Sequence, residues 1–201
     1  MKQIIFSIIN YETGNYGSLI GIINKLGHRA VVTNKSYEIN KSHFVILPGV
    51  GTFGSSIKTL KKKKLDKLIR KISYLETPIL GICLGMQLLT FFSSENGRNS
   101  GLRIIPGQIE ENYKRNHHIG WNNISIKKNS DFIDFDNKSF YFQHGFSYFG
   151  PEKYKLSSTK FMNKKIVSII QKDNVTGVQF HPEKSQQNGV NFLEKYIDIF
   201  K

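Results

Sequence analysis

The chain has 201 residues, 39 % of them hydrophobic, and its 29 Lys and Arg against 15 Asp and Glu give a formal net charge of +14. This length fits a single domain, residues 1–201, with a substantial core, and no apolar run approaches the ~18–20 residues of a membrane span. The single cysteine excludes an intrachain disulfide and is typical of the reducing cytosol, so we expect a cytoplasmic protein.

The positive charge raises the question of a polyanionic partner. The chain carries no nucleic-acid-binding motif, and the run from Lys61 to Lys64 falls in a helical pattern that points its side chains in several directions. We therefore interpret the charge as solvated surface charge and expect neither a nucleic acid nor a membrane as partner. An acidic partner protein is the alternative.

The first half of the chain alternates between strand and helix patterns. A buried strand is predicted at residues 3–9, and the short apolar run there is not followed by a signal-peptide cleavage site. Further strands are predicted at 30–33, at 44–51, where the strand runs into a glycine loop, and at 78–82. Helices are predicted where apolar residues recur at helical spacing, namely at 19–26, 57–72 and 84–92.

The second half consists of short strand-like segments separated by turn residues, followed by a last helix. The strands are predicted at 103–109, 120–128, 139–143, 154–159, 165–171 and 175–180, and the helix is marked by Leu193, Tyr196, Ile197 and Phe200. The βαβ alternation of the first half predicts a parallel sheet, and these segments add antiparallel pieces. We expect an α/β fold with an open, mixed and mostly parallel sheet flanked by helices.

The only cysteine lies at a predicted strand-to-helix turn. Gly81-Ile82-Cys83-Leu84-Gly85 has the form G-x-C-x-G, the thiol version of the nucleophile elbow, which exposes a reactive side chain at the sheet edge. The amides and dipole at the start of the following helix favour a thiolate and could bind an oxyanion. An inert buried cysteine is the alternative interpretation.

A second motif supplies the partners that such a nucleophile needs. In "VQFHPEKS", residues 178–185, His181 and Glu183 are two apart, which places both side chains on one face of an extended chain that Pro182 ends. An imidazole next to a carboxylate can accept and return protons while the carboxylate orients it. Alone, the motif would fit a strand-terminating turn. Cys83, His181 and Glu183 together predict a catalytic triad.

A third segment is the glycine loop in "LPGVGTFG". Its Gly49, Val50 and Gly51 offer backbone amides with few side chains in the way, and the predicted strand layout puts this loop beside the elbow. It could donate to an oxyanion or cover a substrate, although an ordinary strand-to-helix turn would look similar. His117, His118 and His144 could suggest a metal site, but they lack metal-ligand spacing, so we predict surface or hydrogen-bonding histidines and no metal site.

The whole chain resembles the class I (triad) glutamine amidotransferases, whose fold is flavodoxin-like. "GICLGMQLL" and "QFHPEKS" are specific for the class, and "GNYGS", "PGVGTFG", "HIGWN" and "YFQH" are similar to the glutaminase subunit of imidazole glycerol phosphate synthase. The resemblance implies an enzyme that hydrolyses L-glutamine at Cys83, with His181 and Glu183 as the other triad members. It implies no cofactor.

The resemblance also implies further site residues and a partner. Oxyanion and substrate contacts would come from Gly49, Val50, Gly51, Leu84, Gln87, His144, Gly145 and Phe146. Asn15 and Lys184 would contact a separate synthase subunit. In histidine biosynthesis that subunit is a (β/α)₈ barrel cyclase, which would form a heterodimer with this chain and receive ammonia through a channel.

Two segments depart from the pattern of this subunit. His144-Gly145-Phe146 stands where a histidine, a small hydroxyl residue and a tyrosine are usual, and Gly17 replaces a longer side chain. Related glutaminases with glycine-bearing loops serve synthases that amidate a sugar of a surface polysaccharide, which is the first alternative for the partner. Two rival functions also fit the sequence: a stand-alone thiol hydrolase, and a scaffold subunit with a vestigial triad.

Overall fold

A computed structural model describes residues 3–11, 16–112 and 116–201, and its main feature is a nine-stranded sheet. The strand order is β2-β1-β3-β4-β13-β12-β11-β8-β9. These strands are β1 (Ile5–Ile9), β2 (Arg29–Thr33), β3 (Phe44–Leu47), β4 (Ile79–Ile82), β8 (His118–Ile126), β9 (Ser139–His144), β11 (Lys155–Phe161), β12 (Lys164–Lys172) and β13 (Val175–Val178).

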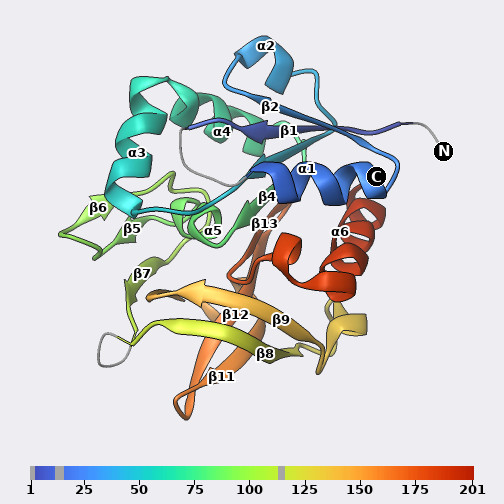
Figure 1. Ribbon diagram of the computed structural model, residues 1–201. Coiled ribbons are helices and arrows are strands. Elements are labelled where there is room, and N and C mark those ends of the chain that lie inside the picture. Colours follow the sequence, from blue (N-terminus) through green and yellow to red (C-terminus); the bar gives the residue numbers. More distant parts are fainter. Residues whose placement is uncertain (1–2, 12–15, 113–115) are drawn as a thin grey trace.

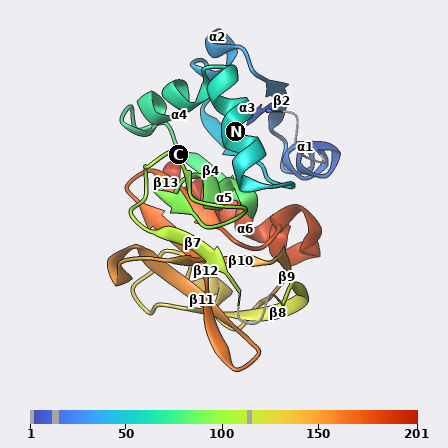
Figure 2. The same ribbon diagram turned by 90° about the vertical axis from the view of Figure 1, so that its left-hand side faces the viewer.

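The sheet has a parallel part and an antiparallel part. Strands β2, β1, β3, β4 and β13 pair in parallel, in the strand order of flavodoxin-like sheets. From β13 onward, β12, β11, β8 and β9 pair antiparallel. The predicted open, mixed α/β sheet is confirmed, and Figures 1 and 2 show the helix-rich parallel part above the antiparallel strands.

Helices cover both faces of the parallel part. They are α1 (Tyr16–Lys25), α2 (Ser36–Ile39), α3 (Phe53–Lys62), α4 (Leu65–Ser73), α5 (Leu84–Leu88) and α6 (Gln186–Phe200). Short 3-10 turns lie at η2 (Ile133–Phe135), η3 (Glu152–Tyr154) and η4 (Pro182–Lys184). Apolar side chains of α1 and α6 pack in one core cluster, and those of α3, α4 and α5 pack in a second.

Alternation along the central strands explains the two clusters. In β3, Phe44 and Ile46 belong to the cluster with α1 and α6, whereas Val45 and Leu47 belong to the other. Successive side chains of a strand point to opposite faces, so a continuous apolar run is what a sheet covered on both faces requires. The strands predicted in the first half are confirmed, with β1, β3 and β4 buried and β2 partly exposed at the sheet edge.

The predicted helix over 57–72 is two helices. The first helix, α3, ends at Lys62. Lys64 then adopts a left-handed conformation, with φ 57°, before α4 begins at Leu65. Leu60 and Leu65 are five residues apart, one more than a continuous helix allows on one face, and the extra residue is absorbed at this break. Both leucines remain buried in the same cluster.

The predicted helix over 84–92 ends at Leu88. Its last carbonyl oxygens accept hydrogen bonds from the segment that follows: the Leu102 amide donates to the Leu88 oxygen at 2.8 Å and the Ile105 amide to the Leu89 oxygen at 3.0 Å. These bonds replace the next helical turn and lead into a second sheet with the order β10-β7-β5-β6. Its strands are β5 (Phe92–Ser93), β6 (Asn99–Ser100), β7 (Gln108–Glu111) and β10 (Phe146–Phe149).

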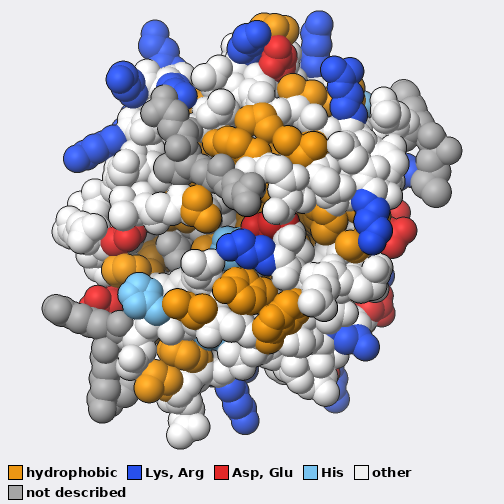
Figure 3. Space-filling model, viewed as in Figure 1, with side chains coloured by type: hydrophobic (Ala, Val, Ile, Leu, Met, Phe, Trp, Pro, Cys, Tyr) orange, Lys and Arg blue, Asp and Glu red, His pale blue; other side chains and the backbone are white. Residues whose placement is uncertain are grey.

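The strand predicted at 103–109 begins only at Gln108, because the chain before it makes those bonds to α5 and passes through Pro106. The other strands of the second half and the last helix are confirmed. In Figure 3, most Lys and Arg side chains lie toward the edges of the face shown, one lies near its centre, and they do not form one patch, as expected for solvated charge. Within the described ranges, none of the helices has the length and hydropathy needed to cross a bilayer.

Candidate active site

Cys83 lies at a strained turn between β4 and α5. Its φ of 49° and ψ of −108° are outside the conformations that side-chain-bearing residues usually adopt. Backbone bonds hold it there: the Cys83 amide donates to the Val178 oxygen at 2.7 Å, and the Gln87 amide donates to the Cys83 oxygen at 3.2 Å. This geometry is the nucleophile elbow that the G-x-C-x-G motif predicted.

The glycines around the cysteine allow three backbones to approach closely. A Cβ on Gly85 would lie 1.8 Å from the Leu47 carbonyl oxygen, and a Cβ on Gly49 would lie 2.4 Å from the Gly85 nitrogen. Neither position tolerates a side chain without a backbone shift. The loop at residues 48–51 therefore lies directly against the elbow, as the strand layout predicted. The Tyr11 hydroxyl fixes this loop by donating to the Pro48 oxygen.

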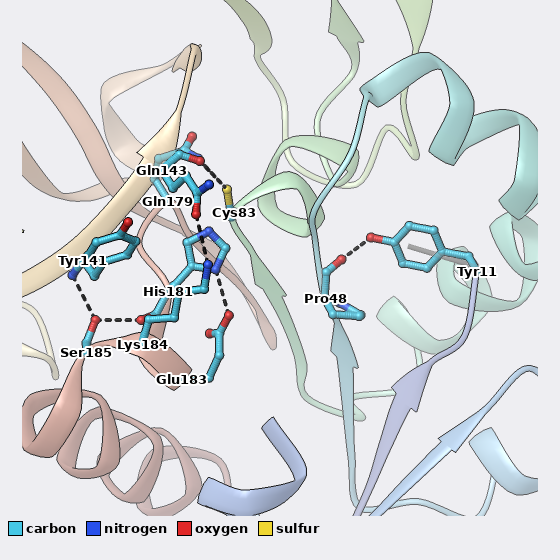
Figure 4. Close-up of polar contacts among 10 residues, drawn as sticks. All are labelled: Tyr11, Pro48, Cys83, Tyr141, Gln143, Gln179, His181, Glu183, Lys184 and Ser185. Carbon is cyan, nitrogen blue, oxygen red and sulfur yellow. Dashed lines mark hydrogen bonds and ion pairs between the residues drawn. The ribbon is translucent and has the colours of Figure 1, made fainter. Parts of the chain in front are cut away.

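His181 and Glu183 follow β13, the strand next to β4. The Nδ1 atom of His181 lies 2.8 Å from Glu183 Oε1, and the two side chains are 2 % and 9 % exposed. Figure 4 shows the imidazole between the Cys83 sulfur and the Glu183 carboxylate. Because Glu183 occupies Nδ1, the other ring nitrogen is the one available to Cys83.

The backbone of His181 is fixed by a buried hydroxyl. Ser185 donates to the His181 oxygen at 2.6 Å and accepts from the Tyr141 amide at 3.0 Å, while the His181 amide donates to the Tyr141 oxygen at 2.9 Å. The turn that carries the imidazole is thus attached to β9 at two points. This anchoring orients the ring without using either of its nitrogens.

The electrostatic surroundings favour the imidazolium form of His181. Burial lowers its pKa, but the charge of Cys83 and hydrogen bonds to Cys83 and Glu183 outweigh burial and raise the pKa to about 10. A protonated His181 carries a positive charge that stabilises a thiolate beside it. The arrangement can therefore hold a nucleophilic sulfur and a proton donor at the same time.

A cavity of about 270 Å³ opens at this point. Cys83 and His181 line it together with all eight residues predicted for oxyanion and substrate contacts: Gly49, Val50, Gly51, Leu84, Gln87, His144, Gly145 and Phe146. Glu183 does not line the cavity and lies behind His181. Lys184 donates to Gln143 Oε1, at 3.0 Å, on the cavity wall, whereas Asn15 lies outside the described residues.

Sequence patterns did not indicate several residues of the site. Glu95, His117, Ile119 and Gln143 also line the cavity. Glu95 is the only acidic residue among the lining residues, and its Oε2 accepts a bond of 2.7 Å from the Phe53 amide. It lies on the turn between β5 and β6. Acidic residues in turns are usually exposed to solvent, so nothing in the sequence distinguished Glu95 from an ordinary turn residue.

The three clustered histidines behave as hydrogen-bonding side chains where the structure pairs them. His144 Nδ1 lies 2.9 Å from the Phe146 oxygen, and its Nε2 lies 3.1 Å from His118 Nδ1. Burial is the main reason that the pKa values fall to about 3 for His144 and about 4 for His118, so both rings are neutral at physiological pH. In the portion of the chain that is described, no group of three or more potential metal-ligating side chains is found.

Two other hollows, of about 350 and 650 Å³, lie on the antiparallel strands. Their walls are formed mainly by serine, asparagine and lysine side chains, with Ile126, Leu156 and Val167 in the smaller one, and contain no cysteine or histidine. Among the three hollows, Cys83 and His181 line only the 270 Å³ cavity.

Comparison with known proteins agrees with this geometry. The family "Glutamine amidotransferase class-I" matches residues 8–198. The chain is 39 % identical to imidazole glycerol phosphate synthase subunit HisH 2 of Vibrio vulnificus strain YJ016, over 96 % of this chain and 94 % of that protein. It is 36 % identical to subunit HisH of Oceanobacillus iheyensis, over 98 % of this chain and 100 % of that protein.

Solved structures with little sequence identity share the fold. PurLQS from Thermotoga maritima superposes with a TM-score of 0.77 at 15 % identity, covering 100 % of both chains. A glutamine amidotransferase from Thermotoga maritima gives 0.68 at 20 % identity, covering 99 % of this chain and 84 % of that one. The family match over residues 8–198 and the relatives at 36–39 % identity show that the chain belongs to the class I glutamine amidotransferases, a family of enzymes.

Proposed function

We propose that this chain, as a single domain, is a glutaminase that releases ammonia from L-glutamine for a separate synthase subunit. The observation that carries the proposal is the buried His181, held between Cys83 and Glu183 at the wall of the cavity. It supplies a nucleophile, a proton carrier and an orienting carboxylate in the order that thiol-based amide hydrolysis needs.

The reaction follows from these positions. The Cys83 thiolate attacks the side-chain amide carbon of glutamine, and His181 donates its proton to the departing nitrogen, which leaves as ammonia. The resulting thioester is attacked by water, whose proton His181 accepts, and glutamate is released. Amides of Leu84 and of the Gly49–Gly51 loop, both at the cavity, are the donors nearest to the developing oxyanion.

The lining residues also suit the amino-acid end of the substrate. Glu95 offers a carboxylate to the α-ammonium group, and Gln87 offers a side-chain amide to the same end. The Phe53 amide keeps the Glu95 carboxylate in one orientation. We therefore assign Glu95 to substrate binding alongside the eight residues that the resemblance implied.

The proposed partner is the synthase subunit that makes imidazole glycerol phosphate, a (β/α)₈ barrel cyclase bound as a heterodimer. Relatives at 36–39 % identity over nearly the whole chain carry the name of a subunit of this synthase, which supports the assignment. Val50 and Ile119 line the cavity and are exposed, and Trp121 is exposed on the same strand as Ile119. Such an apolar rim fits contact with a second protein.

The experiment compares Cys83→Ala with the native chain in the presence of the cyclase subunit. We expect the variant to lose glutamine-dependent synthesis, with at least ~10³-fold lower rate because the nucleophile is gone. Synthesis from added ammonium salts should remain, since the variant only removes the ammonia source. Loss of both activities would contradict the assignment, because the cysteine would then be structural.

The rival functions give different outcomes in the same assay. A sugar-amidating synthase that is activated in place of the cyclase would assign the chain to surface-polysaccharide synthesis. Hydrolysis of glutamine or other amides at full rate without any synthase would indicate a stand-alone thiol hydrolase. Retention of glutamine-dependent synthesis by Cys83→Ala would leave only a scaffold role.

A further inference from the structure

We propose that Gln179 is a positioning residue that joins the Cys83 sulfur to the substrate-binding Gln87 through one buried side-chain amide. The inference rests on the proposed function and deepens it. It assigns a role to the glutamine two residues before His181, a residue that does not line the cavity.

The sheet itself brings Gln179 to the cysteine. Val178 pairs with Ile82 in the parallel ladder of β13 and β4, so Gln179 and Cys83 each follow a paired residue on adjacent strands. Gln179 is fully buried, and its backbone amide donates to the Ser168 oxygen at 2.9 Å. Its side chain reaches the sulfur, as Figure 4 shows, with 3.7 Å between Nε2 and Sγ.

The direction of the Gln179 amide follows from its neighbours. The Phe146 carbonyl can only accept, so the atom of Gln87 that lies 3.1 Å from it is the donating Nε2. The same Nε2 lies 3.4 Å from the Gln179 side chain, which must present its oxygen there. The nitrogen of Gln179 therefore faces the Cys83 sulfur, and the opposite orientation would place two donors against each other.

This amide opposes the effect of a backbone carbonyl on the other side of the sulfur. The Gln143 carbonyl oxygen lies 3.6 Å from Cys83 Sγ and accepts from the thiol. That bond favours the protonated sulfur, and the same oxygen is repulsive toward a thiolate. The N–H of Gln179 favours the thiolate, because hydrogen bonding to a charged form stabilises it.

The Gln179 side chain also couples thiol reactivity to glutamine binding. Gln87 lines the cavity and holds Gln179 through Nε2, while Phe146, another lining residue, holds Gln87. Loss of the Gln179 amide would free Gln87 on the substrate side and remove a donor on the sulfur side. We therefore expect changes in both thiol reactivity and glutamine binding from one substitution.

The test measures alkylation of the chain's single cysteine by iodoacetamide across pH, which reports on Cys83 alone. In Gln179→Met, which keeps length and loses the donor, we expect the midpoint of the pH profile to rise by about one pH unit. Gln179→Glu should raise it further, because a carboxylate repels the thiolate. Both variants should lower kcat/KM for glutamine by at least ~10-fold and raise KM, with ammonium-dependent synthesis preserved.

Thr176→Val is the matched control. Thr176 lies on β13, is fully buried, and its hydroxyl has no hydrogen-bond partner, so its replacement perturbs the same strand without touching the sulfur. Its alkylation profile should equal that of the native chain. An unchanged midpoint in Gln179→Met, or an equal shift in Thr176→Val, would overturn the proposal.

Two further points keep the test decisive. If Gln179→Met does not fold, as judged by circular dichroism, the alkylation profile of Gln179→Glu decides. If the native chain shows no glutaminase activity with any synthase, the proposed function fails, whereas the alkylation midpoint still reports whether Gln179 acts on the sulfur. The two failures are therefore distinguishable.

Discussion

At the scale of single residues, the buried imidazoles of His144 and His118 belong to a series of hydrogen bonds in which every donor can be assigned. The Phe146 oxygen only accepts, so His144 carries its proton on Nδ1 and accepts at Nε2 from His118 Nδ1. His118 Nε2 then accepts from the Asn122 side chain, 2.6 Å away. Phe142 and Phe161 stack on His118 with ring centroids 4.5 Å away, which excludes water from these hydrogen bonds.

These neutral histidines predict that the protein loses stability in mild acid. Burial lowers the folded pKa values to about 4 for His118 and about 3 for His144, below the ordinary value of 6.5. Between these values and 6.5 the unfolded chain binds more protons, so stability is present above pH 6.5 and falls as pH decreases toward 4. Each of the two histidines contributes a loss on the order of 2–3 kcal/mol, so we expect the free energy of unfolding to fall by roughly 5 kcal/mol between pH 7 and pH 4.5, measured by urea titration.

The variant His118→Asn isolates this contribution. An asparagine can place its amide near the former Nδ1 and keep the bond to His144, but it does not titrate. The free energy of unfolding should therefore depend less on pH, by about one proton over this range. An identical slope in His118→Asn and native protein would contradict the prediction.

At the scale of elements, the glycines at the elbow are requirements of packing. A Cβ on Gly85 would lie within 1.8 Å of the Leu47 oxygen, so α5 would have to move away from β3. We expect Gly85→Ala to lower the free energy of unfolding by about 3 kcal/mol or more and to abolish glutamine hydrolysis.

Gly21 is the matched control because it lies in α1, with nothing within 4 Å of the position that an alanine Cβ would occupy. Gly21→Ala should raise stability by roughly 0.5–1 kcal/mol, since alanine has the better helix propensity and loses less entropy on folding. Thermal unfolding of both variants checks the pair. Equal effects at the two positions would contradict the packing argument.

Local patterns predicted the elements that depend on local physics. The sequence identified strands β1, β3 and β4 and helices α1 and α6, because the order of apolar and polar residues shows whether one face or both faces of an element are buried. The break at Lys64 was missed because the prediction joined Leu60 and Leu65 in one helix despite their five-residue spacing. The early end of α5 was missed because it depends on partners from elsewhere in the fold. For α5 those partners are the amides of Leu102 and Ile105, which take its last carbonyls.

Site residues, too, were predicted where local sequence features mark them and missed where they do not. Cys83, His181 and Glu183 stood out because turn glycines and the His-Pro-Glu spacing are local features. Glu95 did not, since an acid in a turn has no distinctive pattern, and Gln179 begins the motif "QFHPEKS" but the motif alone does not show what its side chain contacts. Only strand pairing across β4 and β13, and the turn between β5 and β6, reveal what these two residues face.

At the scale of the whole molecule, the exposed rim predicts that hydrolysis depends on the synthase. Val50 is 41 % exposed in the loop that we propose as a source of oxyanion donors, and Gly51 beside it has a φ of 113°, in a region that glycine adopts without strain. We expect contact with the synthase to fix the loop in its donating orientation. Glutamate release should rise on the order of ten- to a hundredfold when the synthase and its ligand are added.

The measurement is glutamate release by the chain alone, with the synthase, and with the synthase and its ligand. Lys155→Ala is a control on the far antiparallel strands, away from the cavity, and should show the native activation. A maximal rate in the isolated chain that no synthase changes would contradict partner-dependent activation.

The position of β13 has a consequence for synthesis on the ribosome. This strand is the fifth from one edge of the sheet and enters between β4 and β12, yet it is translated after the other strands of this sheet. Until residues 175–178 emerge, β4 remains an open apolar edge without its neighbour, ready to pair with another nascent chain. Chains that stop before β13 would thus be prone to aggregation, and the strand that completes the surroundings of Cys83 is also the one that closes the edge of β4.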